Sequence, residues 1–231
     1  MRVRQSSDHD RRIAEMFDRV SPRYDRLNRV LSFGTDRSWR RQAVALARLD
    51  TSQRAVDVGA GTGDLTFALA RASAPGARVV AADLSQGMLD VARRRGPLLA
   101  VRASAESLPF ADASLDRVIS GFTVRNVGDL PRALREFRRV LRPGGRAVIL
   151  ELSHPRGPLV PAFYRFYFDR VAPRVAVLLG GDAEAYRYLP RSLKPFPKPD
   201  ALAALLRDAG FARVRFERLT FGIAAIHVAD V

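Results

Sequence analysis

The stretch AVDVGAGTGDLTFALA, residues 55–70, decides the fold class of this chain. An apolar run containing Asp57 is followed by three glycines at alternate positions, 59, 61 and 63, and then by a helical pattern. Glycines permit tight turns and close backbone approach, and a helix that begins just after a strand presents free amide groups to an oxygen-rich ligand. The stretch therefore predicts a strand–loop–helix unit that cradles a ligand.

The loop departs from the dinucleotide pattern G-x-G-x-x-G in two places. Asp64 stands where that pattern has its third glycine, and Asp57 lies two residues before the first glycine. A carboxylate at Asp57 would repel a pyrophosphate, whereas it would attract a ligand that carries a cationic amino group. The rest of the chain has to decide between these ligands.

A regular alternation of apolar runs and helical patterns surrounds this unit. We expect strands at 54–58, 78–82, 98–103, 115–121 and 145–151, helices at 63–72, 86–95 and 129–141, and a tight turn at 142–146. The strands are apolar throughout, which is typical of strands covered by helices on both faces. Strands separated by helices indicate parallel βαβ units, so we predict an α/β, doubly wound, mostly parallel sheet.

The flanking segments follow other patterns. Residues 11–20 have helical spacing, and the segment after them reads as short helices broken at 21–22 and at Gly34. Residues 153–199 hold eight prolines and an aromatic cluster, which predicts an inserted helical cap. A helix at 200–209 and two strands complete a seven-stranded sheet. We expect a single domain over 1–231, divided into an N-terminal helical segment (1–50), a cofactor-binding half (51–152), the cap (153–199) and a C-terminal helix and strand pair (200–231).

Composition excludes several classes of site. The chain has no cysteine, so disulfides and thiolate metal sites are excluded, and its acids and histidines show no metal-ligand spacing. The formal charge is +15 with a pI of about 11.4, which favours anionic partners such as nucleic acid or acidic lipid. No apolar window approaches the length of a membrane span, and the N-terminus lacks the apolar core of a secretory signal, so we expect a cytosolic protein.

Four residues beyond the loop suit an adenosine ligand. Asp83 ends the second strand 20 residues after Gly63, where an acid can accept hydrogen bonds from both hydroxyls of a ribose, although an Asp at a strand end can also simply cap a helix. Met88 on the next helix could pack on adenine or in the core. Ser104 and Ala105 follow the third strand, where the chain could hydrogen-bond the adenine edge.

Four motifs together resemble the class I S-adenosylmethionine-dependent methyltransferases. They are DVGAGTGD, AADLSQGML, SAESLPFADASLDRVISGF and VLRPGGRAVILEL. The resemblance implies that the loop at Gly59 and Gly61 cradles the methionine part of the cofactor. It also implies that Asp57 helps to hold the ammonium group and that Asp83 binds the ribose, which accounts for an acid beside the glycines.

A narrower resemblance covers nearly the whole chain. The segments 16–41 (MFDRVSPRYDRLNRVLSFGTDRSWRR), 122–127 (FTVRNV), 151–155 (ELSHP) and 185–197 (AYRYLPRSLKPFP) are similar to the ubiquinone/menaquinone biosynthesis C-methyltransferase family. The cofactor contacts that this family implies fall on Thr62, Asp83 and the pair Ser104-Ala105. Two positions depart from the family pattern: Ser104, where the family usually has Asn, and the cofactor contact Gly121, where it usually has Ser.

The family resemblance implies C-methylation of the ring of a reduced demethylquinone, demethylmenaquinol to menaquinol, with S-adenosylmethionine as cofactor. A quinol carbon becomes nucleophilic when a neighbouring phenol ionises, and an unperturbed phenol has a pKa near 10, so a cation must favour the phenolate. We assign this electrostatic role to Arg125, and the orientation of the hydroxyl or of a water to Asn126. His154 could accept the proton, although His-Pro also reads as an extended turn. Tyr24 is expected to line the substrate pocket.

Three alternative functions remain open from the sequence. The same family methylates 2-methoxy-6-polyprenyl-benzoquinol on the ubiquinone path, Gly121 suggests another small-molecule methyltransferase, and the pI suggests a nucleic-acid binding or modifying protein. Against the last, the aromatic residues cluster in the apolar cap instead of alternating with basic ones. We therefore expect a polyprenyl quinol and no nucleic acid as partner, and docking on the anionic inner face of the cell membrane through 159–179, which carries Arg165, Arg170 and Arg174. Whether the chain forms a homodimer stays open.

Overall fold

The computed structural model describes residues 8–21, 32, 34–158, 160, 166–171, 174 and 192–231. Its centre is a seven-stranded sheet with the strand order β3-β2-β1-β4-β5-β7-β6. The strands are β1 (Arg54–Val58), β2 (Arg78–Asp83), β3 (Leu99–Arg102), β4 (Leu115–Gly121), β5 (Leu141–Leu152), β6 (Arg213–Leu219) and β7 (Ala224–Asp230). Neighbours among the first five pair in parallel, and β7 pairs antiparallel with both β5 and β6. The predicted fold class is confirmed.

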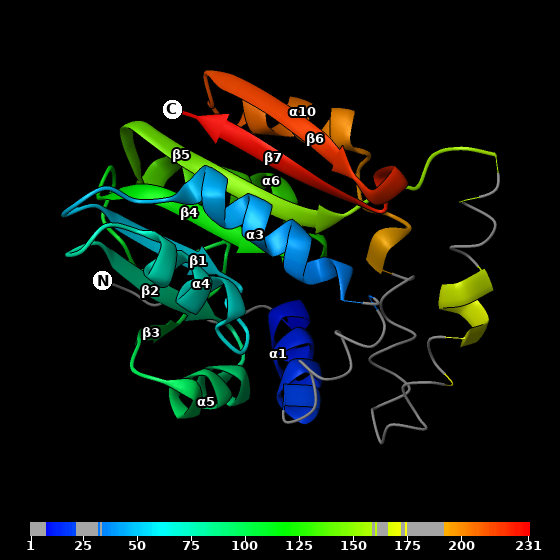
Figure 1. Ribbon diagram of the computed structural model, residues 1–231, viewed down its shortest axis with the longest axis horizontal. Coiled ribbons are helices and arrows are strands. Elements are labelled where there is room, and N and C mark those ends of the chain that lie inside the picture. Colours follow the sequence, from blue (N-terminus) through cyan, green and yellow to red (C-terminus); the bar gives the residue numbers. More distant parts are fainter. Residues whose placement is uncertain are drawn as a thin grey trace.

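Helices cover both faces of this sheet. Figure 1 shows α3 (Thr35–Ala47) and α4 (Asp64–Ala72) on one face and α6 (Leu130–Val140) and α10 (Pro199–Asp208) on the other. The helix α5 (Gln86–Arg95) lies at the β3 edge, and α1 (Asp8–Val20) lies beyond the ends of the central strands. Short helical turns occur at Val124–Asn126 (η2), Tyr167–Val171 (η3) and Thr220–Gly222 (η4).

The apolar runs form the central strands because both of their faces are covered. Val56 of β1 and Val118 and Ile119 of β4 are fully buried. The helix α6 has one apolar side, in which Leu134 and Phe137 are also fully buried against the sheet. Continuous apolar strands with amphipathic helices therefore form one core, as the sequence pattern indicates.

The predicted bounds hold to within a residue or two for most elements, with one clear difference. Residues 142–146, expected as a turn before the fifth strand, lie within the bounds of β5. The pairing shifts there, because Leu115 faces Leu141 whereas Arg117 already faces Arg146. The extra residues bulge out of the ladder, and Gly144 takes a positive φ of 76°. The turn chemistry was thus recognised correctly, but it interrupts a strand instead of preceding one.

Part of the predicted cap can be compared with the structure. Within 153–199 the structure describes 153–158, 160, 166–171, 174 and 192–199. Tyr24 and Arg165 lie outside the described residues. Among the helices of the described part, none is both long enough and apolar enough to cross a bilayer.

A buried histidine on β7 predicts how stability depends on pH. His227 stacks on Phe216 with ring centroids 5.2 Å apart, and its Nε2 lies 2.9 Å from the carbonyl of Pro199, to which it donates. Burial lowers the pKa of His227 to about 4, so the folded chain keeps this ring neutral. The unfolded chain binds a proton below a pKa of about 6.5, so the stabilisation is present above that pH and is lost as the pH falls toward 4.

We expect the free energy of unfolding of the wild type to fall by about 2–3 kcal/mol more than that of a His227→Gln variant between pH 7 and pH 4.5. Urea unfolding of both proteins at the two pH values measures this difference. Equal losses in the two proteins would show that His227 titrates normally in the folded chain.

Candidate functional site

A cleft opens at the carboxyl ends of the central strands. Its volume is about 810 Å³, including the part that opens to solvent, and it is lined by α1, the loop after β1, the end of β2, the segment after β3 and the residues that follow β4. In the order β3-β2-β1-β4 the connections run from β1 outward to β2 and β3, and the chain then returns to β4 on the other side of β1, so the strand order reverses between β1 and β4. Ligands of open α/β sheets bind at such a reversal point, so the topology itself places the candidate site here.

The three glycines of the loop serve different purposes. All have positive φ values, 70° for Gly59, 55° for Gly61 and 87° for Gly63. A Cβ on Gly59 would lie 2.1 Å from Thr123 Oγ1, and a Cβ on Gly63 would lie 2.9 Å from Phe67 Cε2, so packing excludes larger residues at both. A Cβ on Gly61 would meet no atom within 4 Å, and Gly61 lines the cleft. Gly59 also lines the cleft, and Gly61 leaves open space for a ligand to approach the backbone.

Asp83 lies at the cleft and organises the backbone around it. Its Oδ2 accepts a hydrogen bond from the Gly61 amide at 2.7 Å, and its Oδ1 accepts one from the Ser85 amide at 2.8 Å. Burial raises the pKa of Asp83, while these amides lower it. Each carboxylate oxygen has a second lone pair, so Asp83 can still accept hydrogen bonds from two ribose hydroxyls.

Asp57 lies beneath the loop and does not line the cleft. It is fully buried, and its Oδ2 accepts a hydrogen bond from Thr66 Oγ1 at 2.6 Å. Burial raises its pKa to about 7, although Thr66 and the charge of Arg40 act in the opposite direction. Within the described part of the chain its Oδ1 has no hydrogen-bond partner. The proposed contact with an ammonium group stays a prediction.

The predicted adenosine contacts are brought together on the β2 and β3 side. Thr62, Met88, Ser104 and Ala105 all line the cleft with Asp83. Met88 is also almost completely buried, so it belongs to both the core and the cleft surface. These side chains offer a thioether, small apolar groups and hydroxyls, a set that suits a purine.

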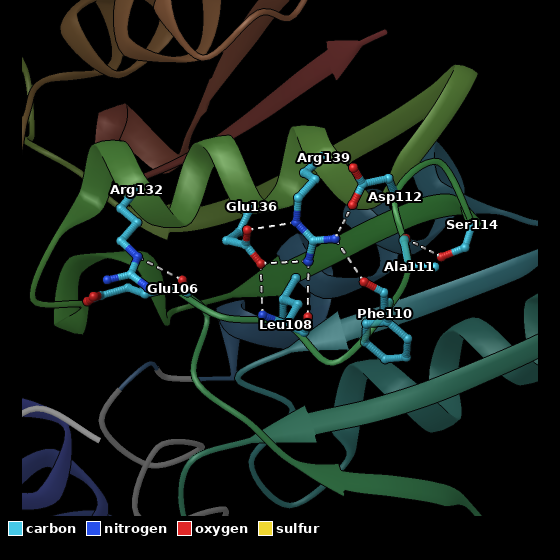
Figure 2. Close-up of polar contacts among 9 residues, drawn as sticks. All are labelled: Glu106, Leu108, Phe110, Ala111, Asp112, Ser114, Arg132, Glu136 and Arg139. Carbon is cyan, nitrogen blue, oxygen red and sulfur yellow. Dashed lines mark hydrogen bonds and ion pairs between the residues drawn. The ribbon is translucent and has the colours of Figure 1, made fainter. Parts of the chain in front are cut away.

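The segment between β3 and β4, which bears Ser104 and Ala105, is fixed to α6. Figure 2 shows that Arg139 reaches from α6 to this segment, where it donates to the carbonyls of Leu108 (3.0 Å) and Phe110 (2.9 Å) and pairs with Asp112. Glu136 accepts a hydrogen bond from the Leu108 amide at 2.9 Å and raises the pKa of Arg139. A segment without regular secondary structure is thereby held in one conformation beside the cleft.

Gly121, at the end of β4, also lines the cleft. A Cβ there would lie 2.5 Å from Leu65 Cδ1, closer than real Cβ contacts allow. A serine, the residue usual in the family, would require the end of the Leu65 side chain to move. The glycine is therefore consistent with the way Leu65 packs in this chain.

Arg125 and Asn126 in η2 face different surroundings. The Arg125 side chain is buried and does not line the cleft; its Nη1 lies 2.5 Å from Glu151 Oε1 and 2.7 Å from the Phe122 carbonyl. Asn126 lines the cleft, and among the described residues none hydrogen-bonds its Oδ1. The structure therefore brings Asn126 to the cleft surface and pairs the Arg125 charge with Glu151, a residue for which no role was predicted from the sequence.

His154, just after β5, is not among the cleft-lining residues either. Burial, with a contribution from the charge of Lys198, lowers its pKa and so makes it a weaker base. Its role as a proton acceptor stays a prediction.

The helix α1 crosses the cleft, which the sequence did not reveal. Its residues Asp10, Ile13, Ala14 and Phe17 line the site. The spacing of its apolar residues predicted a helix but gave no partner for its apolar side. That side covers the cleft.

Each end of α1 is held at one rim of the cleft. Asp18 Oδ1 accepts hydrogen bonds from Ser85 Oγ (2.5 Å) and from the Gly87 amide (2.8 Å). His9 Nε2 lies 2.8 Å from the Asn126 carbonyl, to which it donates. A Cβ on Gly87 would lie 3.0 Å from Asp18 Oδ1, and one on Gly128 would lie 3.3 Å from His9 Cδ2. At each end of α1 a glycine therefore allows the helix side chain to approach closely.

Comparison with known proteins adds the family to this geometry. The model of the ubiE/COQ5 methyltransferase family matches residues 5–230. The chain belongs to this family. It is 50% identical over 220 residues to the demethylmenaquinone methyltransferase of Thermus thermophilus, covering 93% of this chain and 99% of the relative. It is 44% identical to the demethylmenaquinone methyltransferase of Deinococcus radiodurans, covering 99% of this chain and 96% of the relative.

Solved structures agree with the fold. A SAM-dependent methyltransferase from Thermotoga maritima superposes with a TM-score of 0.67 at 22% identity, covering 94% of this chain and 98% of that one. This likeness confirms the class I methyltransferase fold expected from the glycine loop. Family membership itself rests on the sequence matches.

The buried ion pair of this family member yields a prediction about stability. The side chains of Arg125 and Glu151 are 6% and 2% exposed. Removing one partner of a buried pair leaves an uncompensated charge, which costs about 3–5 kcal/mol, whereas replacing both by apolar residues costs much less. We therefore expect Glu151→Ala to lower the free energy of unfolding by about 3–5 kcal/mol, and Arg125→Met with Glu151→Leu to recover most of that loss. Urea unfolding of the single and double variants measures both effects. A loss below about 1 kcal/mol for Glu151→Ala would mean that the pair behaves as a solvent-exposed one.

Proposed function

We propose that this chain transfers a methyl group from S-adenosylmethionine to a ring carbon of demethylmenaquinol, giving menaquinol. The observation that carries the proposal is the 50% identity to a demethylmenaquinone methyltransferase over 99% of that relative. Other relatives, such as one from Geobacter sulfurreducens at 42% identity, are named ubiquinone/menaquinone biosynthesis C-methyltransferase. The benzoquinol ring is therefore the second candidate, and nothing in these relatives favours a nucleic-acid substrate.

The cleft residues fit S-adenosylmethionine. Gly61 leaves open space beside the loop backbone, Asp83 can accept bonds from ribose hydroxyls, and Met88, Ser104 and Ala105 form a surface suited to adenine. The buried acid Asp57 beneath the loop suits a cationic ligand better than it suits a pyrophosphate. When bound, the cofactor supplies a methyl group on a positively charged sulfur.

On the substrate side the chain has to orient the quinol and accept its proton. We assign orientation to Asn126, because it lines the cleft and its Oδ1 has no hydrogen-bond partner among the described residues, so this oxygen can accept a hydrogen bond from a ring hydroxyl or from a water that takes the proton. Phe122 adds an aromatic surface to the same part of the cleft. We keep Arg125 as the predicted electrostatic group. To contact a phenolate directly, its guanidinium would have to leave Glu151 and pair with the substrate instead. Tyr24 remains the predicted substrate contact.

The reaction is tested with methyl-labelled S-adenosylmethionine and with demethylmenaquinol prepared by chemical reduction of demethylmenaquinone. We expect the label in menaquinol, identified by mass spectrometry. We also expect the Asp83→Ala variant to bind S-adenosylhomocysteine roughly 10- to 100-fold more weakly than the wild type does, because a charged hydrogen-bond acceptor is lost. Asp90→Ala, an acidic residue on α5 that does not line the cleft, serves as the control. Label transfer only to a demethylated benzoquinol would favour the ubiquinone path, and transfer to neither ring would refute the proposal.

We further propose that the chain docks on an anionic membrane surface, because a polyprenyl quinol resides in the bilayer. In the described part of the cap, Phe166 is 60% exposed and Arg170 and Arg174 are exposed, and in η4 Phe221 is 75% exposed. Aromatic side chains beside basic ones suit the surface of an anionic bilayer, where each basic residue contributes about 1 kcal/mol.

Vesicle flotation tests this docking. We expect salt-sensitive binding to anionic vesicles and little binding to neutral ones, and we expect the double reversal of Arg170→Glu and Arg174→Glu to weaken the binding roughly tenfold or more. Arg71→Glu is the control, because Arg71 is exposed in the last turn of α4, away from the cleft. Equal binding to both vesicle types, or to neither, would contradict electrostatic docking without touching the methyltransferase assignment.

A further inference from the structure

Arg40 of α3 reaches the cleft near the end of β4, where the strand order reverses between β1 and β4. Its guanidinium lies 5.1 Å from the centroid of the Phe122 ring, and its Nη1 lies 3.9 Å from the position of a Cβ on Gly121. Its contact with Asp36 runs through Nε at 3.4 Å, and the Arg40 side chain is 16% exposed. Among the described residues that line the cleft, Arg40 is the sole arginine or lysine.

The order of the strands places Arg40 at the end of the cleft away from the adenosine contacts. Asp83, Met88 and Ser104 lie on the side of β2 and β3, whereas Gly121, beside Arg40, ends β4. The glycine loop after β1 lies between these two groups, because β1 separates β2 from β4 in the sheet. A ligand with its adenosine on the first side therefore extends its other end across the loop toward Arg40.

Two titratable groups of opposite sign lie near that end of the cleft, Arg40 on its surface and Asp57 below it. Asp57 lies beneath the loop, close enough to Arg40 for the guanidinium to act against the rise that burial causes in the carboxyl pKa. A free amino acid group is a zwitterion, with an ammonium and a carboxylate on one carbon. The arginine on the cleft surface and the acid beneath the loop suit these two charges, and guanidinium is the cation best shaped to bind a carboxylate through two hydrogen bonds.

We propose that Arg40 binds the α-carboxylate of the cofactor's amino acid group. This assignment rests on the proposed function, in which that cofactor is S-adenosylmethionine. Asp36 holds the arginine through Nε, and Phe122 supports the guanidinium from one side. Arg40 is thus a residue of the cofactor site supplied by α3, outside the strand–loop–helix unit at 55–70 that bears the glycine loop.

A pair of ligands tests the assignment without relying on turnover. S-adenosylhomocysteine carries the amino acid group, whereas 5′-methylthioadenosine has the same nucleoside and sulfur but no amino acid group. We expect Arg40→Gln to bind S-adenosylhomocysteine roughly 10- to 100-fold more weakly than the wild type does and to bind 5′-methylthioadenosine equally well, as measured by calorimetry. Arg40→Lys should recover part of the loss, because it restores the charge without the planar fork.

Arg41→Gln is the matched control, since it removes the same charge from an exposed position on the same helix. We expect it to bind both ligands as the wild type does. Unchanged affinity of Arg40→Gln for S-adenosylhomocysteine would overturn the proposal, and unchanged affinity with slower turnover would place the guanidinium on the quinol instead. Equal weakening of both ligands would overturn it as well, because Arg40 would then support the shape of the cleft. A wild-type chain that binds neither ligand would refute the cofactor assignment itself.

Discussion

The shape of the cleft depends on the hydrogen bonds that the Asp83 carboxylate accepts. One oxygen binds the Gly61 amide in the loop after β1, and the other binds the Ser85 amide at the start of α5. Ser85 in turn accepts a hydrogen bond from the Met88 amide at 3.0 Å and donates one to Asp18 of α1. One partly buried acid at a strand end thereby fixes the glycine loop and the beginning of α5, and through Ser85 it also fixes the helix that crosses the site. The residue proposed to bind the ribose is therefore also part of the support of its own pocket.

Patterns of local origin allowed most of the fold to be predicted. The strands around Val56 and Ile119 are apolar because they are covered on both faces, and the periodicity of α6 follows from its one buried side. The loop was also predictable from local sequence, because the positive φ values at 59, 61 and 63 favour glycine. Asp83, Met88, Ser104 and Ala105 were found from their distance to strand ends, since the carboxyl ends of parallel strands meet at one edge.

Features that depend on distant partners could not be predicted in this way. The motif around Arg125 gave its position just after β4, but the direction of its side chain depends on Glu151, which is 26 residues away. The helical pattern of α1 was clear, but its place across the cleft depends on contacts of Asp18 with α5 and of His9 with the residues after β4. Arg40 falls in the segment 16–41, but that segment contains several arginines, and its position beside Gly121 and Phe122 is known only from the structure.

The charge of the whole chain and the charge of the cleft have opposite signs. The sequence carries a formal charge of +15, yet the acids Asp57 and Asp83 lie at or beneath the cleft, and Arg40 is its one basic lining residue in the described part of the chain. Under the proposed function a positively charged sulfur would be stabilised locally, while the outer arginines would favour an anionic surface. Burial raises the pKa of Asp57 to about 7, so without a ligand this acid is only partly ionised near neutral pH. Under the proposed function a cationic ligand would favour its carboxylate form, because an opposite charge nearby lowers the pKa of a buried acid.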